Sequence, residues 1–100
     1  MDTTQLQALF EKHEGEYYKF SRVENKYSRL HDLHAFILLD KILANSENHL
    51  EMISAAGHDE IFLAVNVEEL AKLITEEQVI ELIRCGVRYF NEYDCLGMFV

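Results

Sequence analysis

The chain has 100 residues, of which 49% are hydrophobic and 27% are charged, and its formal net charge is −9. This length fits a single domain, and the apolar content is too high for a disordered chain, so we expect order nearly throughout. The N-terminal residues do not resemble a signal peptide, and no apolar run approaches the roughly 18–20 residues that a membrane span needs. We therefore expect a cytoplasmic protein.

The negative charge is concentrated in the second half of the chain. Residues 1–50 contain eight acidic and six basic residues, whereas residues 51–100 contain ten acidic and three basic residues. Direct nucleic-acid binding is not expected, because neutralising a phosphate backbone needs clustered Lys and Arg. The favoured partner is a protein with a basic surface.

Residues Thr4 to Leu43 predict one long amphipathic helix, or a helical pair that bends near Gly15. Apolar and aromatic side chains recur there in steps of three and four, close to the heptad spacing of a coiled coil. A continuous helix of this length would measure about 60 Å, so it would overhang a domain of this size and could pair with a second copy. We therefore expect a homodimer. Its expected seam consists of Phe10, His13, Tyr17, Phe20, Tyr27 and Leu30.

The end of this helical region, residues 35–43, is apolar on nearly all sides, which indicates burial against a sheet. Residues 60–65 predict a buried strand, with residues 50–56 as its hairpin partner. Gly57 leaves an alternative open, because it could instead end a short helix that begins at Ser46.

Two short helices and a second hairpin complete the predicted chain. Asn66 and Thr75 each precede a capping-box pattern, which predicts helices over residues 67–73 and 76–85, with Gly86 just beyond the second. Residues 87–90 and 95–100 read as strands joined by a turn. The predicted fold class is α+β, a single domain in which residues 1–45 (the long helix or helical pair) pack on an acidic ββααββ unit, residues 46–100. Its sheet is small and antiparallel, made of two hairpins.

Three groups of residues could carry chemistry, and none matches a catalytic or cofactor motif. His31 and His34 share a helix face, but two ligands fall short of the three or four that zinc needs. The run from His58 to Glu60 lacks a nucleophile, so we expect Asp59 to close a turn through backbone amides. Cys85 and Cys95 lack metal-type spacing and are expected to be free thiols. We predict no enzyme activity, no metal and no cofactor.

The feature that most favours a binding function is a set of acidic residues on the two short helices. Carboxylates spaced along a surface can imitate the phosphates of a duplex or dock on the basic groove of a nucleic-acid-handling protein. The alternative is a solvated face that only maintains solubility. The predicted partner-binding face consists of Glu68, Glu69, Glu76, Glu77 and Glu81.

Three strings in the C-terminal half resemble small proteins encoded by phages and prophages: HDEIFL (58–63), RCGVRY (84–89) and MFV (98–100). The resemblance implies an accessory protein that acts on a host system by binding. Small acidic phage proteins of this kind include inhibitors of CRISPR–Cas complexes (anti-CRISPR proteins) and DNA-mimicking antirestriction proteins. We therefore predict a phage-derived inhibitor that docks on a basic surface of a host nucleic-acid-handling complex. The alternative is a structural or regulatory oligomer that works through the helical seam.

Overall fold

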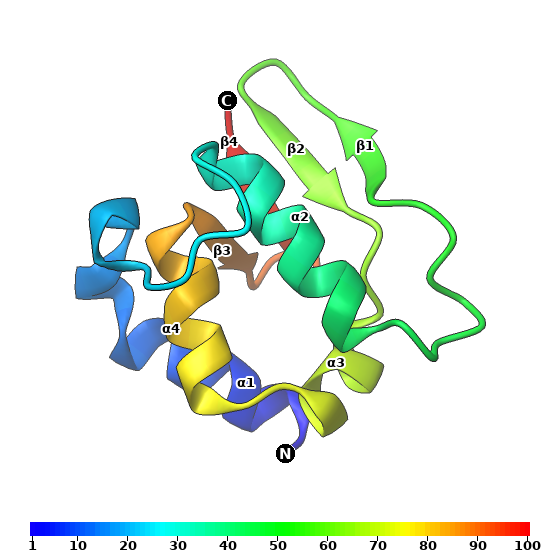
Figure 1. Cartoon of the computed structure of the whole chain (residues 1–100). Helices are drawn as coiled ribbons and strands as arrows, with labels where there is room; N and C mark the ends of the chain where they lie inside the picture. Colours follow the sequence, from blue (N-terminus) through cyan, green and yellow to red (C-terminus); the bar gives the residue numbers. More distant parts are fainter.

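The computed structural model describes residues 1–100 and shows an α+β fold (Figure 1). The helices are α1 (Thr3–Lys12), α2 (His31–Ile42), α3 (Val67–Leu73) and α4 (Glu76–Arg84), with two 3-10 turns, η1 (Glu14–Glu16) and η2 (Phe20–Arg22). The strands are β1 (Ile53–Ala56), β2 (Glu60–Leu63), β3 (Val87–Phe90) and β4 (Cys95–Phe99). The radius of gyration is 12.3 Å, as expected for one domain of this length.

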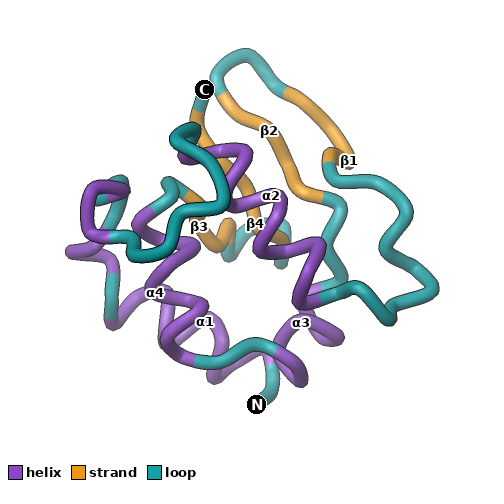
Figure 2. The backbone as a smooth tube through the Cα atoms, viewed as in Figure 1, coloured by secondary structure: helices purple, strands orange, loops and turns teal.

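The prediction of one long N-terminal helix is wrong. Helix α1 ends at Lys12, and residues 13–30 form only η1, η2 and irregular turns before α2 begins (Figure 2). Tyr18 and Asn25 have φ of 62° and 52°, values that an α-helix excludes. Contacts with α4 override the helical periodicity here: the backbone N–H of Tyr18 donates to the carbonyl of Ile83 at 3.0 Å. The helical pair is the closer description, although a structured connection separates its members.

Burial of the apolar end of this region is confirmed. Helix α2 places Ala35, Leu38 and Leu39 in the core, followed by Leu43, while Asp40 and Lys41 are exposed. Figure 1 shows α2 lying across the front of the molecule, with β3 and β4 behind it. The helix therefore contributes its apolar face to the single hydrophobic core.

The four strands form one antiparallel sheet in the order β1-β2-β4-β3. Residues 53–56 pair with β2 as a strand, so the alternative of a short helix ending at Gly57 is wrong. Because successive side chains of a strand point to opposite faces, Leu63, Val87, Leu96 and Met98 enter the core from one face. The other face carries a separate set of aromatic residues, described below.

The two short helices begin at the caps that the sequence predicts. The side chain of Asn66 accepts from the backbone N–H groups of Glu68 and Glu69, and Thr75 forms a reciprocal capping box with Gln78. Cys85 caps the end of α4, and Gly86 follows with φ of 94°, a conformation that favours glycine. These local signals were sufficient to place both helices.

Candidate functional site

His31 and His34 lie on α2, as expected, but each ring contacts a different part of the chain. The Nδ1–H of His31 donates to the carbonyl of Cys85 at 2.7 Å, and its Nε2 accepts from the hydroxyl of Tyr18 at 3.1 Å. The proton is assigned to Nδ1 because the carbonyl oxygen of Cys85 can only accept a hydrogen bond. His31 therefore links α2 to the end of α4, and both of its ring nitrogens are occupied.

His34 is completely buried and joins α2 to α4. Its Nδ1 accepts from the backbone N–H of Tyr27 at 3.1 Å, so the neutral ring carries its proton on Nε2 and donates to Glu81 at 2.7 Å. The ring of Tyr27 stacks on it with centroids 4.8 Å apart. No group of three or more His, Cys, Asp or Glu side chains is arranged to hold a metal ion.

The remaining candidates for chemistry are placed as follows. Cys85 and Cys95 are both free, and burial raises the pKa of the Cys85 thiol to about 12, so it is neutral at physiological pH. His58 is exposed. The turn before β2 is closed by the backbone, with the N–H of Gly57 donating to the carbonyl of Glu60 at 2.7 Å. The prediction that the Asp59 side chain closes this turn is therefore wrong.

The five glutamates of the predicted acidic face differ in their surroundings. Glu76 pairs with the Nε2 of His13 at 2.7 Å and with Lys12 at 3.3 Å. The hydrogen bond from His13 has the largest effect in lowering the pKa of the Glu76 carboxyl, followed by that from Lys12. Glu81 is bound to His34, and Glu69 accepts from the hydroxyl of Ser46 at 2.9 Å. Glu68 and Glu77 are exposed and their carboxylates make no hydrogen bond or ion pair. Only these last two are free to meet a partner without breaking an internal contact.

The expected dimer seam does not exist as a helical stripe. Of its members only Phe10 lies within an α-helix, where it is buried inside this chain. His13, Tyr17, Phe20, Tyr27 and Leu30 all lie in the segment between α1 and α2. These residues therefore do not share one helix face, and the homodimer stays a prediction.

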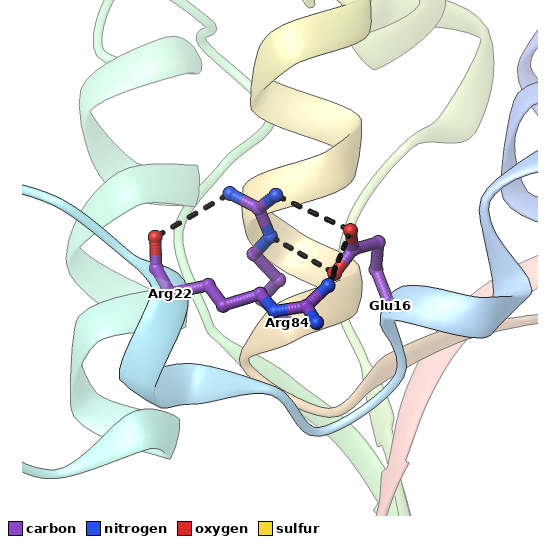
Figure 3. Close-up of polar contacts among 3 residues, drawn as sticks. All are labelled: Glu16, Arg22 and Arg84. Carbon is purple, nitrogen blue, oxygen red and sulfur yellow. Dashed lines mark hydrogen bonds and ion pairs between the residues drawn. The ribbon is translucent and has the colours of Figure 1, made fainter.

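The segment between α1 and α2 is fixed to α4 by a carboxylate shared between two arginines (Figure 3). Glu16 accepts from Arg22 at 2.9 and 3.0 Å and from Arg84 at 3.3 and 3.4 Å. Arg84 also reaches the carbonyl of Arg22 at 3.5 Å. The hydrogen bond from Arg84 is the largest influence that lowers the pKa of Glu16, and the contact from Arg22 adds to it. The contacts hold η1 and η2 against the end of α4.

A hollow of about 790 Å³ lies beside η1, within the size range of ligand pockets. Its lining is mixed: five of the ten lining residues are hydrophobic, and Glu11 and Glu14 are exposed lining residues. Residues from both faces of β3 line it, Val87 and Tyr89 from the core face and Arg88 from the other. The hollow therefore opens at the free edge of β3. Sequence reasoning missed it because strand order is not readable from a pattern of strands.

The outer face of the sheet carries a second feature that the sequence did not reveal. Phe62, Phe90, Tyr93 and Phe99 pack on one another with ring centroids 5.5–5.8 Å apart. The ring of Phe90 covers Gly97, where an added Cβ would lie 2.0 Å from its Cε2 atom. None of these rings belongs to the hydrophobic core. They form an aromatic cluster in which Tyr93 and Phe99 are exposed.

Comparison of the chain with protein-family models, curated proteins and solved structures finds no match. No helix combines the length and the apolar character needed to cross a membrane.

Proposed function

We propose that this chain is a non-enzymatic binding protein that docks, through exposed carboxylates, on a basic surface of another protein. The observation that carries the proposal is that most of its acidic residues form no internal ion pair. Of the 18 acidic residues, ion pairs involve only Glu16, Asp40, Asp59, Glu76 and Glu81. The remaining carboxylates are not neutralised within the chain, and those that also make no hydrogen bond, such as Glu68 and Glu77, stay available to a basic partner.

The partner that best fits this charge is a nucleic-acid-handling protein, whose basic groove normally binds phosphates. A protein that presents carboxylates to such a groove competes with the nucleic acid and acts as an inhibitor. This agrees with the resemblance to phage accessory proteins, the class that includes anti-CRISPR and DNA-mimicking proteins. Binding without chemistry is also consistent with Cys85, whose thiol is neutral, and with His34, whose two ring nitrogens are bonded.

The test begins with capture of partners from a bacterial lysate at low and high salt, followed by affinity measurements on the purified partner. The double variant Glu68→Lys/Glu77→Lys should weaken binding by about tenfold or more, because both carboxylates are exposed and unpaired. The matched control is Glu47→Lys/Glu51→Lys, which makes the same change in net charge at exposed residues outside α3 and α4. Glu76 is unsuitable, since its replacement breaks the contacts to Lys12 and His13.

Two results would overturn the proposal. One is an affinity that does not change with salt, because exposed charge pairs are screened. The other is equal binding by the wild type and Glu68→Lys/Glu77→Lys. For the more specific idea of nucleic-acid mimicry, duplex DNA should displace the protein from its partner, and simultaneous binding of both would contradict it.

A further inference from the structure

We infer that the hollow beside β3 binds an extended, basic segment of the partner, which adds to the sheet as a strand next to β3. This inference rests on the proposed function and specifies the form in which the partner presents its positive charge. The observations behind it are a free strand edge, aromatic and aliphatic side chains in a mixed lining, and two unpaired carboxylates among the lining residues.

The free edge of β3 provides the main-chain part of the site. In an antiparallel pair, alternate residues point their N–H and C=O groups away from the neighbouring strand. Beyond its pairing with β4, β3 has one further backbone bond, from the N–H of Tyr93 to the carbonyl of Phe90. The outward groups of Val87 to Tyr89 thus have no protein partner, and an added strand can bind them.

The second edge of the sheet, at β1, is a poorer site for strand addition. The register of β1 against β2 shifts between Ile53 and Ala55, and such an irregularity twists an edge and disrupts its ladder. β1 is also exposed at all four residues, and none of them lines the hollow beside η1. By contrast, β3 pairs with β4 in unbroken register and faces the hollow.

The side chains of the hollow indicate what the added segment contains. Phe10, Tyr17 and Tyr89 offer apolar surface to alternate side chains of an extended chain. Glu11 and Glu14 have exposed carboxylates that form no ion pair or hydrogen bond, so they favour Lys or Arg on the incoming segment. The one cation of the lining, Arg88, lies over the rings of Tyr17 and Phe99, 5.3 and 5.2 Å from their centroids. A second copy of this chain is disfavoured by its net charge of −9.

Gly15 allows a direct test. It lies in η1 on the lining of the hollow, and an added Cβ would meet no atom within 4 Å. Gly15→Trp should therefore obstruct part of the hollow without disturbing the fold. The matched control is Gly57→Trp, which adds the same bulk in the β1–β2 turn, where the nearest atom to a Cβ is Glu60 Cγ at 3.5 Å. Thermal unfolding of both variants checks that each is folded.

The probe is a labelled peptide of alternating lysine and valine, about eight residues long, enough to span the four residues of β3. Its binding is measured by fluorescence anisotropy, and the amides it protects are found by hydrogen exchange and NMR. We expect protection at β3, and we expect Gly15→Trp and Glu11→Lys/Glu14→Lys each to weaken binding about tenfold. Gly57→Trp should bind like the wild type, and a peptide of alternating glutamate and valine should not bind.

Protection at β1, or binding unaffected by Gly15→Trp, would overturn the inference. The inference would also be overturned if, without peptide, the amides of β3 became protected as the protein concentration rises. In that case the added strand would come from a second copy of this chain. The outcome is separable from that of the proposed function. Suppose that Gly15→Trp binds the purified partner normally while Glu68→Lys/Glu77→Lys does not. That result would support the proposed function and contradict the strand-addition site in the hollow.

Discussion

His34 and Glu81 are 47 positions apart in the sequence, and a 2.7 Å hydrogen bond joins them across the interface of α2 and α4. The imidazole has no solvent exposure, whereas 30% of the Glu81 side chain is exposed. The buried ring thus uses one nitrogen to bind α4 and the other to hold the backbone at Tyr27. Glu81, which the sequence placed on the predicted partner-binding face, therefore also joins two helices of the fold.

Replacing His34 by phenylalanine should lower the free energy of unfolding by about 1–3 kcal/mol. Phenylalanine preserves the aromatic contact with Tyr27. It leaves the backbone N–H of Tyr27 and the carboxylate of Glu81 without the imidazole nitrogens that they bond. Urea denaturation measures the change. Glu81→Gln is the control, because its amide oxygen can still accept from Nε2 and the loss should be smaller. Wild-type stability in His34→Phe would show that these bonds contribute nothing.

The carboxyl of Glu16 should make stability depend on acidity. Its pKa in the folded protein lies below the ordinary value of 4.5, chiefly because Arg84 donates a hydrogen bond to the charged form. A group with a lowered folded pKa stabilises the protein above its unfolded pKa, and this contribution is lost as the pH falls through the folded value. Unfolding midpoints measured from pH 7 downward should therefore decline less steeply below about pH 4.5 in Glu16→Gln than in the wild type. Parallel curves would contradict this role.

Local signals in the sequence predicted the second half of the fold well. The caps at Asn66 and Thr75 and the glycine after α4 depend only on neighbouring residues, and the structure has both helices where these signals place them. The prediction for the first half was wrong because residues 13–30 carry a helical period and no proline, yet Tyr18 and Glu16 bond to α4 and the helix does not continue. Such contacts are between residues more than 60 positions apart, and no local pattern encodes them.

The same limit applies to the candidate site. Periodicity correctly assigned Glu68 and Glu77 to solvent, but it could not show that Glu76 and Glu81 have internal partners. The hollow beside β3 depends on two non-local facts, the strand order and the path of η1. The charge in its lining, Glu11 and Glu14, was visible in the sequence, but nothing marked it as different from an ordinary solvated surface.

Gly97→Ala should destabilise the sheet by about 1–3 kcal/mol, as overpacking does. The new Cβ would lie 2.0 Å from the ring of Phe90 and 2.8 Å from the carbonyl oxygen of Ile61. Combining it with Phe90→Ala should recover part of the loss, because the ring clash disappears while the carbonyl remains. Denaturation of the two single variants and the double variant gives this coupling. Strict additivity would contradict the close packing of Phe90 over Gly97.

The two cysteines should differ sharply in reactivity. Burial raises the pKa of Cys85 from 9.0 to about 12, which lowers its thiolate fraction by about a thousandfold at a given pH, and the side chain has no solvent exposure. The pKa of the half-buried Cys95 is also raised by burial and by the charge of Asp94, but its sulfur lies on the outer face of the sheet. Iodoacetamide at pH 8 should therefore modify Cys95 first. In the Cys95→Ser variant, Cys85 should react only as fast as the protein unfolds. If Cys85 of the folded variant were labelled as fast as in the urea-unfolded variant, this thiol would not be buried.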